Sequence, residues 1–168
     1  MIVTLTAGLS IDEYLERNFE PGCELLGGET RPKPVGTMTH SIMEKRLTRL
    51  LERFYGERRV QFEVSVIIGE EVLIPDVIVF AGDQPATYRG VLDEAPLLVI
   101  EILSPSQRAV EMLAKCERYR EFGVPFCWVI DPVGRRAWEY NLSQREPAEV
   151  RDTFSGPCAL RLDEVFAG

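Results

Sequence analysis

The sequence has few of the residues on which many enzyme sites depend. His40 is the one histidine among 168 residues, which excludes a zinc site built from several histidines. The four cysteines contain no C-x-x-C pair, so a zinc knuckle is not expected. Of the 19 basic residues only Lys33, Lys45 and Lys115 are lysines. A lysine at a chemically telling position is therefore more informative in this chain than an arginine.

Long apolar runs are also missing. No window approaches the roughly 18 consecutive apolar residues of a membrane-spanning helix, so no membrane association is expected. The first five residues, Met1–Leu5, lack the basic region and long apolar run of a signal peptide. The cysteines could form two disulfides, but we expect reduced thiols in a cytoplasmic protein.

The charge balance is acidic, with 27 acidic against 19 basic residues, a net charge of −8 and a pI near 4.8. Such a chain is not an evident basic nucleic-acid binder. Its 45% hydrophobic and 27% charged residues exclude wholesale disorder. The length fits one domain with a sizeable core, and we expect a single domain over residues 1–168.

Hydrophobic periodicity predicts an α/β or mixed α+β fold. In chain order we expect a helix over 10–18, a Gly- and Pro-rich loop over 27–36, a helix over 40–55, a hairpin of strands over 60–68 and 72–80, an irregular segment over 81–95, a central strand over 96–103, a helix from 104–106 to 122, strands over 126–130 and 136–140, and a short edge strand near 160–162. A strand–helix–strand crossover among hairpins implies a mixed sheet with helices packed on it.

Two carboxylates interrupt the apolar strands of this pattern. Asp76 shares a strand face with Ile74 and Ile78, and Glu101 lies within a strand that is apolar on both faces. Burial of an unpaired carboxylate costs several kcal/mol, so each needs a cation, hydrogen bonds or a shifted pKa. Either acid alone is equally well explained as a strand-end carboxylate that reaches solvent or caps the turn over Ser104–Ser106. For both together, on neighbouring strands, a shared divalent cation is the better explanation.

Lys115 lies at the margin of the apolar face of the helix over 104–122, where its long side chain can reach toward Glu101. The alternative is a lysine that extends to solvent from the helix edge. Beside two carboxylates and a divalent metal, a lysine suits hydrolysis: the metal lowers the pKa of a bound water. The ammonium group can orient that water or stabilise a charged transition state.

These residues resemble a known family, the Uma-type proteins of the PD-(D/E)XK nuclease superfamily, which are restriction-endonuclease-like. The resemblance extends over about residues 10–165. It rests on the order of several short motifs: Glu24–Glu29, His40, Pro75-Asp76, Glu101–Ser106, Lys115, Tyr119, Gly123-Val124-Pro125, Trp128 and Asp131-Pro132.

The resemblance implies a restriction-endonuclease-like mixed sheet flanked by helices. It also implies that Asp76 and Glu101 are Mg²⁺ ligands. We expect the Ile102 carbonyl to join them and Mn²⁺ to substitute for Mg²⁺. The superfamily's usual lysine, two positions after the glutamate, is here Leu103. The resemblance to Uma-type proteins implies that a lysine on the following helix replaces it, and Lys115 matches that position.

Two further residues have less specific roles in the same comparison. Glu24 matches a family acid and would complete the metal shell, although it is one of twenty glutamates. His40 would contact a substrate phosphate or a metal-bound water. Simple capping or solvation at the start of its helix is an equally good explanation of His40.

The leading hypothesis is a Mg²⁺-dependent nuclease that hydrolyses phosphodiester bonds in DNA, with Asp76, Glu101, Lys115 and Glu24 as catalytic residues. The alternative is a catalytically weak or inactive nuclease-fold protein that acts as a binding or oligomeric accessory module. The aromatic residues Trp138 and Tyr140, expected to be exposed on a late edge strand, are compatible with a homodimer.

Overall fold

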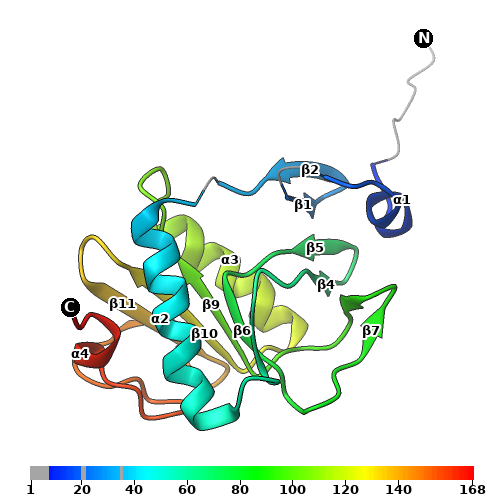
Figure 1. The fold of residues 1–168 in the computed structure, drawn as a ribbon. Helices are drawn as coiled ribbons and strands as arrows, with labels where there is room; N and C mark the ends of the chain where they lie inside the picture. The colour runs from blue at the N-terminus through cyan, green and yellow to red at the C-terminus, as the bar shows by residue number, and fades with distance from the viewer. Residues whose placement is uncertain (1–7, 20–21, 35) are drawn as a thin grey trace.

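The computed structural model describes residues 8–19, 22–34 and 36–168, which form two mixed β-sheets and four helices (Figure 1). The main sheet has the order β12–β11–β10–β9–β6–β3. Its strands are β3 (Val60–Phe62), β6 (Val77–Val79), β9 (Leu98–Ile102), β10 (Phe126–Asp131), β11 (Arg136–Asn141) and β12 (Ala148–Glu149). The parallel pair β9–β10 lies at its centre.

The N-terminal sheet has the order β2–β1–β5–β4–β8–β7. Its strands are β1 (Cys23–Leu26), β2 (Glu29–Pro32), β4 (Val66–Ile68), β5 (Glu71–Leu73), β7 (Thr87–Tyr88) and β8 (Val91–Leu92). The helices are α1 (Ile11–Glu16), α2 (Met38–Tyr55), α3 (Ala109–Phe122) and α4 (Leu162–Val165). The expected mixed fold with flanking helices is confirmed, although its strands form two sheets.

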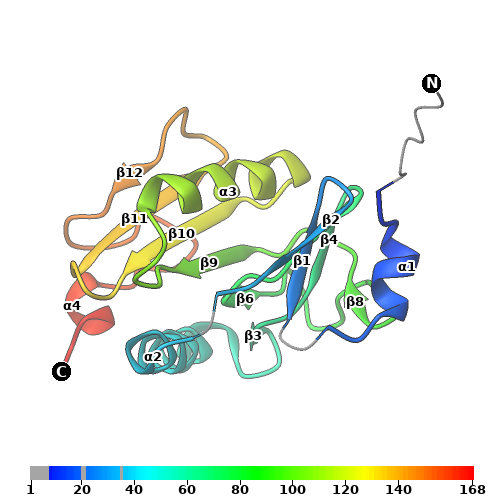
Figure 2. The same ribbon diagram turned by 90° about the horizontal axis from the view of Figure 1, so that it is seen from above.

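Helices α2 and α3 cover opposite faces of the main sheet (Figure 2). Alternate residues of β9 face each helix, because successive side chains of a strand point to opposite sides. Leu98, Ile100 and Ile102 pack in a core with the buried face of α2. Val99 packs in a second core with the buried face of α3. Glu101, in alternation with Ile100 and Ile102, therefore belongs to the α3 side of the sheet.

The predicted hairpin is confirmed in its pairing but wrong in its continuity. The strand expected over 60–68 is divided into β3 and β4, and that expected over 72–80 into β5 and β6. β3 pairs with β6 in the main sheet, and β4 pairs with β5 in the N-terminal sheet. The break has a local cause, because Pro75 has no N–H for a ladder and Glu63 has a φ of +52°.

Other expectations are corrected in the same way. The segment over 27–36 contains β2, paired with β1, in place of a loop, and the segment over 81–95 contains the short strands β7 and β8. Helix α3 begins at Ala109, later than expected, because the chain forms a turn at Ser104 with the Gln107 side chain. The edge strand near 160–162 is replaced by an isolated bridge at Arg161 and by α4.

The aromatic pair on β11 does not form an exposed edge. β11 lies between β10 and β12, and Tyr140 is 5% exposed. The argument for a homodimer from Trp138 and Tyr140 is therefore wrong. Among the described helices, none is long and apolar enough to cross a membrane.

The core packing predicts a sharp contrast between two residues of α2. Leu47 is fully buried, whereas Ile42 is 52% exposed. We expect Leu47→Ala to lower the free energy of unfolding by about 2–5 kcal/mol, since it removes buried methyl groups and leaves a cavity. The matched substitution Ile42→Ala should change it by less than about 0.5 kcal/mol. Urea denaturation followed by circular dichroism measures both, and equal effects would contradict this assignment of the helix faces.

Candidate active site

The register of the main sheet places two buried carboxylates side by side. β6 pairs with β9 so that Val77 lies opposite Ile100, and extending this antiparallel register by one residue sets Asp76 opposite Glu101. Each of these two acids is 2% exposed. They line a small cavity of about 60 Å³, together with Glu24, Ile102 and other residues. The prediction that both acids are buried side by side is confirmed, although Asp76 lies directly before β6 and not within a strand.

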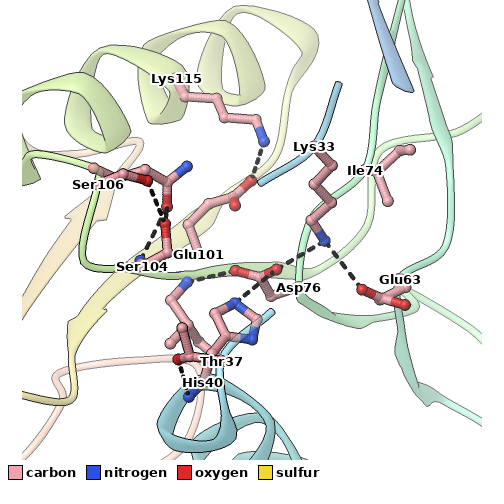
Figure 3. Close-up of polar contacts among 12 residues, drawn as sticks. Lys33, Thr37, His40, Glu63, Ile74, Asp76, Glu101, Ser104, Ser106 and Lys115 are labelled. Carbon is pink, nitrogen blue, oxygen red and sulfur yellow. Dashed lines mark hydrogen bonds and ion pairs between the residues drawn. The ribbon is translucent and has the colours of Figure 1, made fainter. Parts of the chain in front are cut away.

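Asp76 is held by the backbone of the next strand and by two cationic side chains (Figure 3). Its Oδ2 accepts a hydrogen bond from the Ile102 N–H at 2.6 Å. Its Oδ1 lies 2.8 Å from Lys33 Nζ and 3.2 Å from His40 Nε2. Burial alone would raise the pKa of Asp76, but the contact with His40 and the charge of Lys33 outweigh it and lower this pKa to about 2. The carboxylate is therefore ionised at neutral pH.

Glu101 is contacted by two side chains of α3, Tyr119 and Lys115. The Tyr119 hydroxyl donates a hydrogen bond to Glu101 Oε1 at 2.8 Å, and Lys115 Nζ lies 2.8 Å from the same oxygen. Complete burial raises the pKa of Glu101, although the Lys115 charge opposes that effect. Lys115 therefore points into the site, and the alternative of a lysine extending to solvent is wrong.

Glu24, on β1, reaches the same ammonium group from the N-terminal sheet. Its Oε1 accepts hydrogen bonds from Lys115 Nζ at 2.6 Å and from the Ile74 N–H at 2.8 Å. Burial alone would lower the pKa of Lys115, but the charges of Glu101 and Glu24 outweigh it and raise this pKa. Lys115 is thus a permanently charged donor held between two carboxylates.

His40 occupies the first turn of α2, and its ring is part of the site. The Thr37 side chain accepts a hydrogen bond from the His40 N–H and caps the helix, while the His40 ring turns toward Asp76. The residue is 8% exposed, so the explanation by solvation is wrong. The contact with Asp76 raises the pKa of His40 above its usual value, although burial opposes the shift.

Two residues of the site were missed in the sequence. Lys33 was noted only as a rare lysine, and its place in a Gly- and Pro-rich segment was the available signal. Glu44 lies one helical turn after His40, and this spacing of four residues puts both on one face of α2. His40, Glu44 and Asp76 offer ligand atoms that lie within 4.8 Å of one another.

The residues present fit a divalent cation. Asp76 Oδ1 is buried, and among the described residues its contacts are ion pairs with Lys33 and His40, which a cation could replace. Asp76, Glu101 and Glu24 contribute carboxylate oxygens around the cavity, and Ile102 also lines it. Oxygen donors of this kind suit Mg²⁺ and Mn²⁺. A cavity of 60 Å³ has room for an ion or for about two waters.

The single histidine makes the site directly measurable by NMR. We expect the ring of His40 in the metal-free protein to titrate with a midpoint above the usual 6.5, because Asp76 stabilises the imidazolium. In Asp76→Asn the midpoint should fall below that of the wild type, since the carboxylate is lost and the burial remains. A proton-detected pH titration of the ring Cε1–H measures both, and an unchanged midpoint in the variant would contradict the contact.

Removal of Lys115 should destabilise the fold in a pH-dependent way. Lys115→Met leaves Glu101 and Glu24 without their cation, and breaking a buried pair typically costs about 3–5 kcal/mol. The pKa of Glu101 is already raised by burial, so its proton binds more tightly in the folded than in the unfolded state. The destabilisation should therefore be larger at about pH 8 than at about pH 5, because a fall in pH favours protonation of Glu101 and removes its unpaired charge.

Chemical denaturation at both pH values measures this effect. The control is Lys45→Met, which removes the same charge from an exposed position of α2. An equal, pH-independent loss in the two variants would show that the buried ion pair does not contribute.

Comparison with known proteins agrees with this architecture. The profile of the Uma2 family, described as "Putative restriction endonuclease", matches residues 11–168. A crystal structure described as a "putative nuclease belonging to DUF820" from Anabaena variabilis superposes with a TM-score of 0.80 at 23% identity, covering 95% of this chain and 98% of that chain. A search of curated proteins gives no match. The chain therefore belongs to the Uma2 family and has the fold of a solved nuclease-like protein.

Proposed function

We propose that the protein is a Mg²⁺-dependent nuclease that hydrolyses phosphodiester bonds in DNA. The observation that carries this proposal is the pair of buried carboxylates, Asp76 and Glu101, with the Lys115 ammonium group 2.8 Å from Glu101. A purely structural core would be as stable with apolar residues at these positions. Membership of the Uma2 family supports the same reaction class.

Asp76, Glu101 and the Ile102 carbonyl would hold the metal ion, and Mn²⁺ would substitute for Mg²⁺. When bound, such an ion lowers the pKa of a water ligand and neutralises charge on a phosphoryl oxygen. The protein contributes a rigid frame, because the Ile102 N–H binds Asp76 Oδ2 and Tyr119 binds Glu101 Oε1. These bonds hold the carboxylates in position before a substrate arrives.

Lys115 would orient the attacking water and stabilise negative charge on the phosphate. Its raised pKa keeps it protonated, so it acts as a hydrogen-bond donor and an electrostatic group. Glu24 would hold the ammonium group in place through the 2.6 Å hydrogen bond and assist the metal shell. Leu103, at the superfamily's usual lysine position, is buried in the apolar core against α3, so the ammonium group reaches Glu101 from the helix.

His40 would contact the phosphate of the substrate. Its ring reaches Asp76 from α2, on the opposite side of the site from Lys115, which reaches Glu101 from α3. With its raised pKa, the ring carries a positive charge over a wider pH range than a free histidine. A cation on each side of the carboxylate pair is a suitable environment for a phosphodiester.

A second candidate function is a nuclease-fold binding module without catalysis. The observation in its favour is that Lys33 and Lys115 neutralise Asp76 and Glu101 through ion pairs, with no need of a metal. The net charge of −8 also disfavours loose contact with a polyanion. Activity and metal binding distinguish the two functions.

We expect the purified protein to nick supercoiled plasmid DNA in Mg²⁺ or Mn²⁺, and EDTA to stop the reaction. Asp76→Asn and Lys115→Met should each lower the rate by at least about 100-fold, since each removes a group that acts on the developing charge. Gel electrophoresis of the plasmid forms measures the rate. Glu70→Gln, at an exposed acid outside the site, is the matched control and should retain full activity.

Metal binding is tested separately by calorimetry on the same variants. Wild type and Glu70→Gln should bind Mn²⁺, whereas Asp76→Asn should bind it much more weakly. No nicking of plasmid or single-stranded DNA by the wild type, together with no metal binding, would favour the binding module.

A further inference from the structure

Lys33 is a third buried cation at the site, and the roles above do not use it. It lies directly after β2 and before α2, and its side chain is 17% exposed. Its Nζ lies 2.8 Å from Asp76 Oδ1 and 3.6 Å from Glu63 Oε1. Figure 3 shows the ammonium group between these two acids, with Glu63 on the side away from Glu101.

The ammonium group of Lys33 is buried and is held by ion pairs in the part of the chain that the structure describes. Among the residues that the structure describes, Lys33 Nζ forms ion pairs with Asp76 Oδ1 and Glu63 Oε1, and neither Lys33 Nζ nor Asp76 Oδ1 has a partner in full hydrogen-bond geometry. A buried ammonium group normally uses its three donors, because an unsatisfied buried donor costs free energy. Lys115 offers the contrast, since its Nζ donates a hydrogen bond to Glu24. Lys33 therefore has donors available for an anionic ligand.

Lys33 also stands at the junction of two hollows. With Pro34 it lines the 60 Å³ cavity of the carboxylates and a larger groove of about 560 Å³. Glu63, Arg17 and Phe19 line only the groove. The small cavity has room for about two waters and cannot hold a nucleotide. A phosphodiester that reaches Asp76 from the groove must therefore pass Lys33.

We propose that Lys33 is a substrate-binding residue that contacts a DNA phosphate at the junction between the groove and the carboxylate cavity. In the metal-free protein it neutralises Asp76, and a divalent cation at Asp76 takes over that role. With the cation bound, the ammonium group would be free to bind the phosphate, as the flexible four-carbon stem of a lysine allows. This inference rests on the proposed nuclease function.

DNA binding under non-cleaving conditions tests the proposal. Binding of a fluorescent double-stranded oligonucleotide in Ca²⁺ is measured over a series of salt concentrations for wild type, Lys33→Met and Lys33→Arg. Loss of one phosphate contact should reduce the slope of log K against log salt by about 0.9. Lys33→Met should show that reduction and a severalfold weaker affinity, whereas Lys33→Arg should retain most of both.

The matched control is Arg151→Met, which removes one positive charge from an exposed position just after β12, at the far end of the main sheet from β3. It should leave the slope unchanged, so that net charge alone does not explain the result. Thermal unfolding confirms that each variant is folded, and Lys33→Arg keeps the test informative where Lys33→Met fails to fold.

Calorimetry with Mn²⁺ alone supplies the second readout. Lys33→Met should bind Mn²⁺ more tightly than the wild type, because the competing ammonium group is gone. If the wild type binds DNA and Lys33→Met binds it with the same salt slope and the same affinity as the wild type, this inference is overturned and the nuclease proposal stands. A wild type that binds neither DNA nor Mn²⁺ would overturn both.

Discussion

The burial of two adjacent carboxylates is the constraint on which the rest of this structure depends. Asp76, directly before β6, lies opposite Glu101 of β9 with almost no exposure, and two ionised acids so placed repel one another. Each acid forms an ion pair with one lysine: Asp76 with Lys33, and Glu101 with Lys115. A divalent cation that binds Asp76 and Glu101 must therefore compete with the ammonium groups of Lys33 and Lys115 for the carboxylate oxygens.

The architecture brings these cations in from separate elements. The parallel crossover from β9 through α3 to β10 lays α3 across the face that carries Glu101, so Lys115 meets Glu101 directly. The N-terminal sheet then adds Glu24, 91 residues away in sequence from Lys115. The break at Pro75, where the chain passes from one sheet to the other, frees Asp76 from a regular ladder. Its carboxylate can then accept the Ile102 N–H.

The net negative charge of the chain does not describe the local charge of the site. A net charge of −8 describes the whole molecule, whereas the site combines Asp76, Glu101 and Glu24 with the cations Lys33 and Lys115. Glu44 and Glu63 lie beside the same cations, so a bound divalent metal would offset an excess of negative charge in this region. Such an arrangement opposes non-specific adhesion of DNA and still suits a phosphodiester delivered to the cavity.

Local sequence patterns determined much of this protein. The apolar run of β9 and the apolar stripe of α2 predicted the buried segments. An acid in each of two apolar segments and a lysine at the margin of the apolar face of α3 marked the site. Periodicity reports whether a residue is buried, because burial is a property of its own element. It does not report which residues of other elements a buried side chain contacts. The division of the hairpin between two sheets, the approach of Lys33 to Asp76 and the joining of Glu24 to Lys115 depend on long-range register and packing. Only the tertiary structure decided them, since such contacts form between segments whose local patterns are independent of each other.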